Sequence, residues 1–425
     1  METTKGTGLL SDEANVSEGL RNVLMTGQAT NAANRSDRTE RHAGGIIERH
    51  RRRIHRRLRS LAFSALVLAA AGSRDANAAP LPSVPPGFAL SVLTDQVPGA
   101  REIALGPPGV LFIGTMGAGQ VYAVRFDPAA PKPVAKVTTI ASDLEAPAGV
   151  AYHNGDLFIS ATTRIMVLRN IAEHLDEPPK PEVLIDHLPW RSGDHDWKFI
   201  AFGPDRRLYI PIGSPCNVCD IGHAFGKLMR AEADGSHLED VAYGLRNSVG
   251  FTWQPQGNGS FPIFLTDNGR DWLGDDIPSD ELNRVDHVGQ DFGFPHCHQG
   301  DIADPKFGAG HPCSGYTPPI VKLGAHVAAL GLRFYDGTAL PEPLRGSLIV
   351  AEHGSWNRST PSGYRVVAVT IRDGKPTGQQ DVLFNGLSGR TPLARPADVQ
   401  PLPDGSILIS DELYGRLYRL SWQGR

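Results

Sequence analysis

The sequence predicts an all-β domain, a six-bladed β-propeller, on two observations. The chain has 425 residues with 47 Gly and 34 Pro, a turn-rich composition that favours many short strands over long helices. A unit of at least three apolar runs also recurs six times along it. Repeats of this kind, with several short strands in each, are typical of propeller blades.

The three runs of each unit can be followed in order. A first run ends in a turn (102–108, 149–155, 199–205, 248–255, 331–337 and 398–405). A second, more apolar run follows (110–114, 156–160, 208–213, 263–267, 347–351 and 406–410), and a third closes the unit (119–124, 164–168, 226–230, 280–285, 364–369 and 415–420). Equivalent positions in the second runs lie 46, 51, 55, 85 and 59 residues apart. The run 88–93 precedes the first unit, and we expect it to supply the outer strand of the last blade and close the ring.

The propeller is expected to occupy residues 80–425. Residues 49–59 are strongly basic, residues 61–72 form a short apolar run, and small residues follow at 76–79. This order is typical of a secretory signal, and the run is too short to cross a bilayer. We therefore expect residues 1–79 to be a disordered extension plus a signal segment, with a mature start near Ala79. The predicted location is periplasmic or secreted, and Sec and twin-arginine export both remain open.

The long fourth interval holds an insertion at about 267–327, rich in Gly and Pro. Irregular segments on a regular scaffold often carry binding groups. Two of the four cysteines lie in it. An even number of cysteines in an exported protein favours disulfides, most simply Cys216 with Cys219 and Cys297 with Cys313. A redox or metal role for the first pair is the alternative, but Asp220 rather than His follows it, and no second close pair completes a zinc site.

The charge balance bears on partners. Subtracting the 13 basic and 8 acidic residues of 1–79 from 42 and 46 leaves 29 and 38, a formal net charge of −9. An acidic chain without basic clusters argues against nucleic acid and anionic membranes as partners, and no stable membrane insertion is expected.

Propeller geometry brings distant residues together. The innermost strand of every blade starts from the same face, so the residues just ahead of these strands gather at one mouth of the central channel. Those positions hold Arg101, Pro147, residues 195–198, Arg246, Asn247, His326 and Arg395. This mouth therefore collects cations and imidazoles, and it is the candidate site.

His195 is the candidate general base. A neutral imidazole can accept a hydroxyl proton near neutral pH, and a neighbouring carboxylate, here Asp194, can fix its tautomer. The alternative is a hydrogen-bonded structural histidine. Arg246 with Asn247 offers a guanidinium fork and an amide that can hold a carboxylate or an oxyanion, unless the arginine forms a salt bridge between blades.

Three further candidates complete the mouth. Arg395 can hold an anion, and the loop of Asn357 is placed as a candidate at the same face. Trp197 and Trp356 are candidates for a stacking surface, with core filling as the alternative. The oxygen-rich residues 267–283 can offer carbonyls and carboxylates to a hard cation such as Ca²⁺, or can form a solvated acidic loop.

Several of these motifs form a family pattern. Asp194-His195 followed by Gly-Pro-Asp at 203–205, Gly-Leu-Arg-Asn at 244–247, Asp-Glu-Leu-Asn at 280–283 and Gly-Gln-Asp-Phe-Gly-Phe-Pro at 289–295 together resemble the glucose/sorbosone dehydrogenase family. That family comprises soluble six-bladed quinoproteins that use pyrroloquinoline quinone (PQQ) and Ca²⁺. Residues 213–219 and 354–359 look like its sorbosone dehydrogenase branch. The resemblance covers about residues 85–422.

The resemblance implies a function and a set of roles. An aldose or sugar-derived aldehyde would be oxidised, with hydride passing to PQQ and electrons leaving to a periplasmic quinone or cytochrome. The resemblance implies that His195 is the base and that Asp194 orients it. It implies that Arg246 faces the quinone oxygens with Asn247 beside it, and that Arg395 binds a quinone carboxylate with support from a residue of the Asn357 loop. It also implies that the backbone carbonyls of Gly269 and Arg270 coordinate Ca²⁺.

Three departures from the family pattern leave alternatives open. Ser214 stands where glucose-oxidising members carry Asp, Pro147 lies near a missing substrate-contacting Gln, and Ala397 replaces a second cofactor arginine. A metal-dependent lactonase-type hydrolase and a non-catalytic carbohydrate-binding propeller are the two rival hypotheses.

Overall fold

Strands form almost all of the regular structure in the computed structural model, which describes residues 80–127, 135–254 and 259–424. The predicted extension and signal segment, 1–79, lies outside the described residues. Three short 3₁₀ turns, η1 (Ile171–Glu173), η2 (Cys313–Gly315) and η3 (Glu342–Leu344), are the helical elements of the described chain. No helix among these residues is long and apolar enough to cross a membrane.

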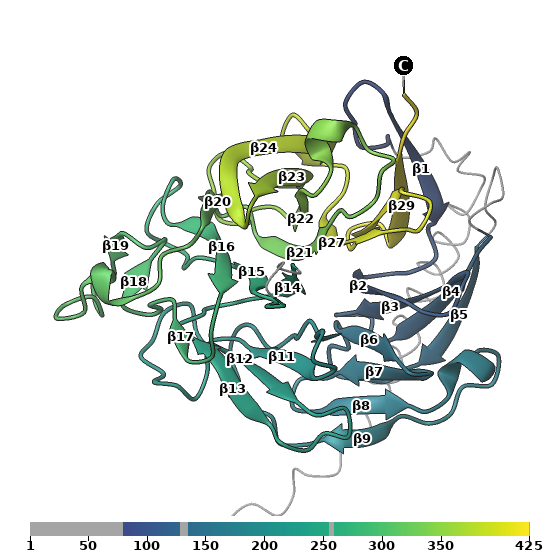
Figure 1. Ribbon diagram of the computed structural model, residues 1–425, viewed down its shortest axis with the longest axis horizontal. Helices are drawn as coiled ribbons and strands as arrows, with labels where there is room; N and C mark the ends of the chain where they lie inside the picture. The colour runs from purple at the N-terminus through teal and green to yellow at the C-terminus, as the bar shows by residue number, and fades with distance from the viewer. Residues whose placement is uncertain (1–79, 128–134, 255–258, 425) are drawn as a thin grey trace, which may run out of the picture. The chain divides into compact units, whose positions relative to one another are not determined.

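The strands form the six blades of a propeller, which confirms the predicted fold (Figure 1). Blade 1 comprises β2 (Ala100–Leu105), β3 (Val110–Thr115), β4 (Val121–Arg125) and β5 (Lys136–Ala141), and blade 2 comprises β6 (Val150–His153), β7 (Asp156–Ser160), β8 (Ile165–Leu168) and β9 (Glu182–Ile185). Blade 3 comprises β10 (Ala201–Phe202), β11 (Leu208–Ile212), β12 (Lys227–Ala231) and β13 (Glu239–Tyr243).

The other three blades repeat this order. Blade 4 comprises β14 (Gly250–Trp253), β15 (Ile263–Asp267), β16 (Ser279–Val285) and β20 (Val321–Ala325), and blade 5 comprises β21 (Ala329–Phe334), β22 (Leu348–Glu352), β23 (Arg365–Arg372) and β24 (Lys375–Asn385). Blade 6 comprises β27 (Pro396–Pro401), β28 (Ile407–Asp411), β29 (Arg416–Trp422) and β1 (Phe88–Thr94). The first three strands of each blade match the predicted runs, and a fourth completes it.

Pairing of the first strand with the last closes the ring, as predicted. β1 runs antiparallel to β29, with Phe88 opposite Trp422 and Leu90 opposite Leu420. The rings of Phe88 and Trp422 pack edge to face at 5.0 Å. Gly87 has φ +87°, and a Cβ there would lie 2.4 Å from the Trp422 ring, so both the turn and the packing require glycine.

The hydrophobic core lies between neighbouring blades. One cluster joins blades 5 and 6 through the fully buried rings of Tyr335, Phe384 and Tyr418. Each blade presents apolar side chains on both faces because each is sandwiched by two others, and all five residues of β22 are buried. Burial of one such large side chain stabilises the fold by about 1.5–3 kcal/mol.

Two buried carboxylates join the innermost strands around the channel. Glu102 Oε2 accepts the backbone N–H groups of Val150 (3.0 Å) and Ile200 (3.1 Å), linking blade 1 to blades 2 and 3. Asp398 Oδ2 accepts the N–H of Ile103 at 2.9 Å, linking blade 6 to blade 1. Burial raises the pKa of both carboxyls, and the positive charge of Arg333 opposes that rise.

Both predicted disulfides are present. Cys216 bonds Cys219, and Cys297 bonds Cys313. Of residues 267–327, β16 and β20 are regular strands of blade 4. The segment between them adds β17 (Gln290–Asp291), which pairs in parallel with β13, and the small sheet of β18 (Cys297–His298) and β19 (Ile302–Ala303). A two-stranded sheet of β25 (Leu387–Ser388) and β26 (Thr391–Pro392) precedes blade 6.

Candidate functional site

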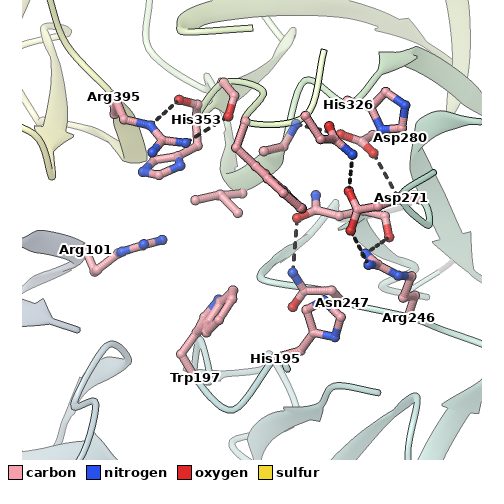
Figure 2. A pocket seen from close by; sticks show the side chains of 17 residues that line it. Arg101, His195, Trp197, Arg246, Asn247, Asp271, Asp280, His326, His353 and Arg395 are labelled. Atoms are coloured by element: carbon pink, nitrogen blue, oxygen red, sulfur yellow. Dashed lines mark hydrogen bonds and ion pairs between the residues drawn. The ribbon is translucent and has the colours of Figure 1, made fainter. Parts of the chain in front are cut away.

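A cavity of about 190 Å³ lies where the innermost strands begin (Figure 2). It gathers residues from five of the six blades. They are Arg101, His195, Trp197, Arg246, Asn247, Asn268, Gly269, Asp271, Asp280, His326, Ala328, Leu330, His353, Gly354, Trp356, Asn357 and Arg395. Pro147 of the predicted mouth is not among them, and Lys198 turns away to bond the carbonyls of Thr162 and Asp196.

The local backbone places His195 at the cavity wall. His195 precedes β10 and has φ 62°, a left-handed conformation that costs a non-glycine residue on the order of 1–3 kcal/mol. Gly213, just after β11, makes room for it, because a Cβ at Gly213 would lie 2.6 Å from both the Cβ and the carbonyl oxygen of His195. The imidazole is 9% exposed, so it is shielded from bulk water.

A backbone carbonyl fixes the tautomer of this ring. Nδ1 of His195 lies 2.7 Å from the carbonyl oxygen of Ser214. A carbonyl only accepts, so Nδ1 carries the proton and Nε2 keeps its lone pair. The predicted role of Asp194 is therefore wrong. Asp194 is exposed and makes no hydrogen bond to the ring in the described structure, because the left-handed turn directs the imidazole toward Ser214.

The surroundings keep His195 neutral. Burial is the main cause that lowers its pKa, the positive charge of Arg246 is the second, and together they bring the pKa from 6.5 to about 3. The bond to Ser214 opposes them weakly. At neutral pH the ring is therefore an unprotonated base whose Nε2 accepts no hydrogen bond from another described residue.

Arg246 is held rigidly beside it. Its Nε donates to Asn217 O (2.8 Å), Nη2 to Asn217 Oδ1 (2.9 Å) and Asp271 Oδ2 (3.1 Å), and Nη1 to Asn268 O (3.1 Å). The backbone N–H of Arg246 also donates to Asp267 Oδ2 at 2.9 Å. Four of the five guanidinium N–H groups are thus used, and its side chain is 5% exposed. The contacts fix the plane of the fork, with Asp271 as the only ionic partner within the described chain.

Two amides extend this network. Asn247 Nδ2 donates to Asn268 Oδ1 at 3.1 Å, and Asn357 Nδ2 donates to Asp271 Oδ1 at 2.6 Å. The second bond ties the loop after β22 to the loop after β15, so the structure places Asn357 at the cavity. Asn357 Oδ1 is buried without a hydrogen-bond partner among the described residues.

Arg101 and Arg395 form a cationic side opposite Arg246 (Figure 2). Arg395 donates to the carbonyls of His353 (3.3 Å) and Gly354 (2.9 Å), and Arg101 Nη2 donates to Glu412 at 2.7 Å. Glu412 also accepts Nε2–H of His353 at 2.7 Å. Both arginines keep N–H groups without partners in the described structure, which suits an anionic ligand.

Buried carboxylates lie behind the loop of residues 268–271. Asp280 lines the cavity and accepts the N–H groups of Gly269 (2.8 Å) and Ala328 (2.6 Å). Burial raises its pKa to about 7. Burial likewise raises the pKa of Asp267 and of Glu281. Burial therefore favours the protonated, uncharged form of these three carboxyls.

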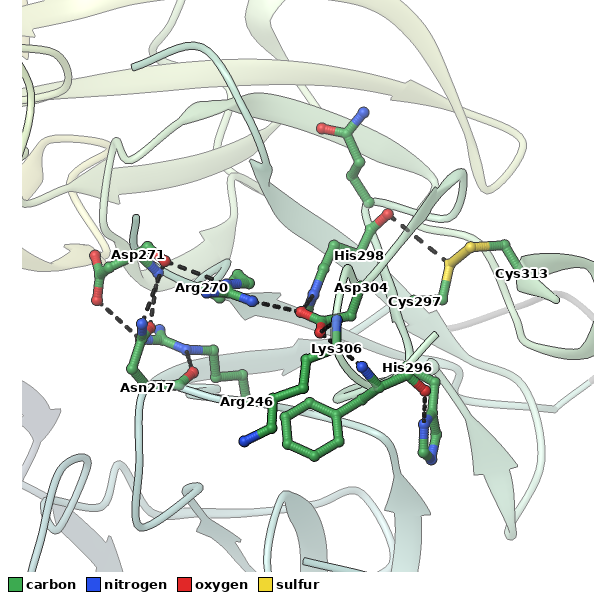
Figure 3. A network of polar contacts seen from close by, with 12 residues as sticks. Asn217, Arg246, Arg270, Asp271, His296, Cys297, His298, Asp304, Lys306 and Cys313 are labelled. Atoms are coloured by element: carbon green, nitrogen blue, oxygen red, sulfur yellow. Dashed lines mark hydrogen bonds and ion pairs between the residues drawn. A yellow bond between two sulfur atoms is a disulfide. The ribbon is translucent and has the colours of Figure 1, made fainter. Parts of the chain in front are cut away.

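The calcium prediction concerns two backbone carbonyls. Gly269 lines the cavity, and the Arg270 side chain turns outward to an ion pair with buried Asp304 at 2.5 Å (Figure 3). Neither carbonyl, Gly269 O or Arg270 O, accepts a hydrogen bond from another described residue, so both remain available to a hard cation. No group of three or more His, Cys, Asp or Glu side chains is arranged to hold a metal in the described chain.

Aromatic rings line the cavity. Trp356 lines the cavity, is 66% exposed and packs edge to face on Trp272 at 5.3 Å. Trp197 also lines the cavity, and it packs against the buried patch of Val249, Leu330 and Ala397, of which Leu330 reaches the cavity. Ala397, the site of a departure from the family pattern, thus belongs to an apolar patch beside the cavity.

Sequence reasoning missed Asn217, His353 and Glu412 as parts of the site. The Cys-Asn-Val-Cys spacing was a usable signal for Asn217, because a disulfide there fixes the residue between the cysteines. The other two follow second strands of blades 5 and 6, so counting those positions around the ring would have found them.

Comparisons with known proteins agree with this architecture. A family model described as Glucose / Sorbosone dehydrogenase matches residues 159–419. An uncharacterized protein of Borreliella burgdorferi is 32% identical over 354 residues, which are 80% of this chain and 90% of that protein.

Solved structures share the fold at low identity. The calcium structure of a Trichoderma reesei Family AA12 carbohydrate-active enzyme has a TM-score of 0.70 and 19% identity, covering 81% of this chain and 98% of that one. The holo form of the pyranose dehydrogenase PQQ domain from Coprinopsis cinerea has a TM-score of 0.66 and 18% identity, covering 81% and 99%. The PQQ-bound aldose sugar dehydrogenase from Streptomyces coelicolor has a TM-score of 0.57 and 18% identity, covering 80% and 99%.

Proposed function

Because the chain belongs to the glucose/sorbosone dehydrogenase family, we propose that it oxidises an aldose or a sugar-derived aldehyde with PQQ as hydride acceptor and His195 as general base. One observation carries the proposal. An unprotonated imidazole, an anchored guanidinium and two further arginines with uncommitted N–H groups line one cavity. Those groups suit removal of a hydroxyl proton next to an anionic planar cofactor.

The cavity fits PQQ by its donor set. PQQ is a planar quinone with three carboxylates, and Arg101 and Arg395 offer charged N–H donors on the side away from Arg246. Arg246 and Asn247 would lie against the quinone oxygens, and Asn357 would support the cofactor from the loop after β22. When bound, PQQ would supply the two-electron acceptor for a hydride from the substrate carbon.

His195 would accept the hydroxyl proton of the substrate. The hydroxyl proton passes to Nε2 while Nδ1 stays bonded to Ser214, so the ring becomes an imidazolium without rotating. Arg246 places a positive charge beside that ring, which disfavours the imidazolium and favours release of the proton afterwards. The substrate loses one hydride and one proton and becomes a lactone or an acid.

Ca²⁺ is proposed as a second cofactor at the carbonyls of Gly269 and Arg270. The free carbonyls and the nearby carboxyl group of Asp280, which accepts the N–H of Gly269, support a cation there. The ion would add positive charge at the quinone side of the cavity. Because the described side chains form no carboxylate cage, no observation favours the rival metal-dependent lactonase.

The substrate is proposed to be a sugar-derived aldehyde such as sorbosone rather than glucose. Ser214 replaces the Asp of the glucose-oxidising members, and its carbonyl, not a carboxylate, holds His195. A neutral partner stabilises an imidazolium less than a carboxylate does, so this base differs from that of the glucose-oxidising members. Export to the periplasm and transfer of electrons to a quinone or cytochrome there are proposed with it, and the two disulfides support export.

A titration and a screen test the proposal. Apo-protein is titrated with PQQ in the presence of Ca²⁺ or EDTA, and the loaded protein is then offered aldoses and sugar aldehydes with an artificial electron acceptor. We expect quinone binding that requires Ca²⁺, and turnover with at least one aldehyde. His195→Gln should lower kcat by about 10²–10⁴-fold and keep PQQ binding. Absence of PQQ binding by the wild-type protein would refute the proposal, and binding without turnover across the panel would favour the non-catalytic carbohydrate binder.

A further inference from the structure

The segment from Ser214 to Cys219 contacts both His195 and Arg246. It follows β11 and ends in the Cys216–Cys219 disulfide, which closes a ring of four residues around Asn217 and Val218. The resemblance to the family marks Ser214 as a departure but assigns Asn217 and the disulfide no role in the reaction.

Ser214 links the two residues through its backbone. Its carbonyl oxygen accepts the Nδ1 proton of His195, and its own N–H donates to the carbonyl oxygen of Arg246, each at 2.7 Å. Ser214 is fully buried, and its hydroxyl donates to Cys216 O at 3.1 Å. One peptide segment thus sets the spacing between the base and the guanidinium.

Asn217 holds the guanidinium itself (Figure 3). Its carbonyl and side-chain oxygens accept Nε–H and Nη2–H of Arg246 at 2.8 and 2.9 Å. The same side-chain oxygen accepts the N–H of Asp271 at 2.8 Å, and Nδ2 donates back to Asp271 O at 3.2 Å. Asn217 therefore pairs with the backbone of Asp271, so the two residues that bond the Arg246 guanidinium are also bonded to each other.

Close packing surrounds this segment. A Cβ at Gly193 would lie 2.1 Å from the carbonyl oxygen of Pro215, and a Cβ at Gly213 would meet His195 at 2.6 Å. The disulfide restricts the backbone of Asn217 further, because it bridges residues three apart. Both cysteines are only half-buried, so the bond is within reach of small thiols.

We propose that the disulfide-closed segment 214–219 is a positioning element, in which Asn217 holds the Arg246 guanidinium at a fixed distance from the His195 ring. This inference rests on the proposed function in naming the two groups as reacting partners, but its contacts exist without any cofactor. Loss of the Asn217 side chain removes one acceptor of Arg246 and both links to Asp271. Opening of the disulfide leaves the acceptors in place and loosens the backbone that presents them.

The test measures the reactivity of Arg246 in apo-protein. Phenylglyoxal modifies accessible guanidinium groups, and a modified Arg246 resists trypsin, so mass spectrometry follows its rate against that of exposed Arg390. The variants are Asn217→Ala, Asn217→Asp and the double variant Cys216→Ser/Cys219→Ser. Asp220→Ala is the matched control, since this exposed neighbour bonds only the N–H of Gly222. Thermal unfolding of each variant is recorded in parallel.

We expect Asn217→Ala to raise the Arg246 modification rate by about tenfold or more, because a charged hydrogen bond and the hold on Asp271 are lost. Asn217→Asp keeps an oxygen acceptor for Arg246 but loses the Nδ2–H that donates to Asp271 O, so its rate should lie between those of wild type and Asn217→Ala. Asp220→Ala should remain near wild type. The double-serine variant should raise the rate, and it gives the same comparison if Asn217→Ala does not fold. Equal rates in wild type and in both disrupted variants would overturn the proposal, as would an equal rise in Asp220→Ala.

A second measurement separates this inference from the proposed function. PQQ affinity should weaken in Asn217→Ala and in the double-serine variant and stay at the wild-type value in Asp220→Ala. Asn217→Asp does not serve in this comparison, because its added negative charge beside Arg246 would itself oppose an anionic cofactor. If wild-type protein binds no PQQ, the proposed function fails, and the apo modification rates still decide the role of Asn217. If PQQ binds equally to all variants and the rates are unchanged, the positioning role fails and the proposed function stands.

Discussion

The carbonyl oxygen of Ser214 accepts the Nδ1 proton of His195 at 2.7 Å, so a neutral backbone group, not a side-chain carboxylate, orients this imidazole. This relationship has two consequences. The proton-accepting nitrogen is Nε2, and its basicity is not raised by a carboxylate partner. The positive charge of Arg246 lowers it further.

The first prediction concerns the protonation of His195 in apo-protein. Its pKa of about 3 is depressed from 6.5, so NMR of ¹⁵N-histidine protein should show a neutral, Nδ1-protonated ring down to about pH 4. The sign for stability follows. A depressed histidine pKa means that the folded state binds fewer protons than the unfolded state, so this contribution to stability is present above pH 6.5 and is lost as the pH falls toward 3. A His195 titration near pH 6.5 would contradict the burial and the charge assigned to it.

The second prediction concerns Arg395 on the cationic side of the cavity. Arg395→Ala removes a charged donor that the protein itself satisfies only with two carbonyls, so PQQ affinity should fall by roughly 10–100-fold. Exposed Arg390 bonds only Ser359 O, and Arg390→Ala provides a control of equal charge change. Equilibrium titration of both variants is the measurement. An equal loss in the two would mean that net charge, and not a contact at Arg395, governs affinity.

The ring of blades and the grouping of residues at its mouth were predictable, because both follow from the pattern of apolar runs that recurs in each unit. The period of apolar runs placed His195, Arg246 and Arg395 ahead of their innermost strands, and the structure brings all three to one cavity. Contacts within that cavity were not predictable in the same way. Asp194 adjoins His195 in sequence, yet a left-handed φ of 62° sends the ring to Ser214 instead.

Contacts between loops of different blades could not be predicted from the sequence either. Asn217 and Asp271 are 54 residues apart and meet through an amide pairing that depends on the shape of both loops. Glu412 of blade 6 accepts hydrogen bonds from Arg101 of blade 1 and His353 of blade 5. The sequence repeat does not predict these contacts, because they depend on the conformations of loops and side chains and not on strand register.

The third prediction concerns Gly213. A methyl group there would lie 2.6 Å from the Cβ and carbonyl oxygen of His195, so Gly213→Ala must displace the histidine loop or β11. We expect a loss of roughly 1–3 kcal/mol in the free energy of unfolding, with a fall in kcat in the fraction that folds. Gly117→Ala is the control, because a Cβ at Gly117 meets no atom within 4 Å. Denaturant unfolding and turnover would be measured together, and wild-type behaviour of Gly213→Ala would show that the loop has room to shift.

The fourth prediction concerns the two tryptophans at the mouth. Trp356 is 66% exposed and lines the cavity, and its ring is braced edge to face by Trp272. An exposed indole beside a sugar site gains contact energy by stacking on the C–H face of the ring, so Trp356→Ala should raise KM by roughly 3–10-fold, as aromatic contacts of about 0.5–1.5 kcal/mol imply, and leave kcat nearly unchanged. Trp272→Ala should have a smaller effect of the same kind, because it acts through Trp356. Trp190 is 48% exposed but does not line this cavity, and Trp190→Ala should leave both constants at wild-type values. A fall in kcat without a change in KM for Trp356→Ala would contradict this prediction. It would show that the indole contributes to the chemical step and not to substrate binding, which would place it against the cofactor.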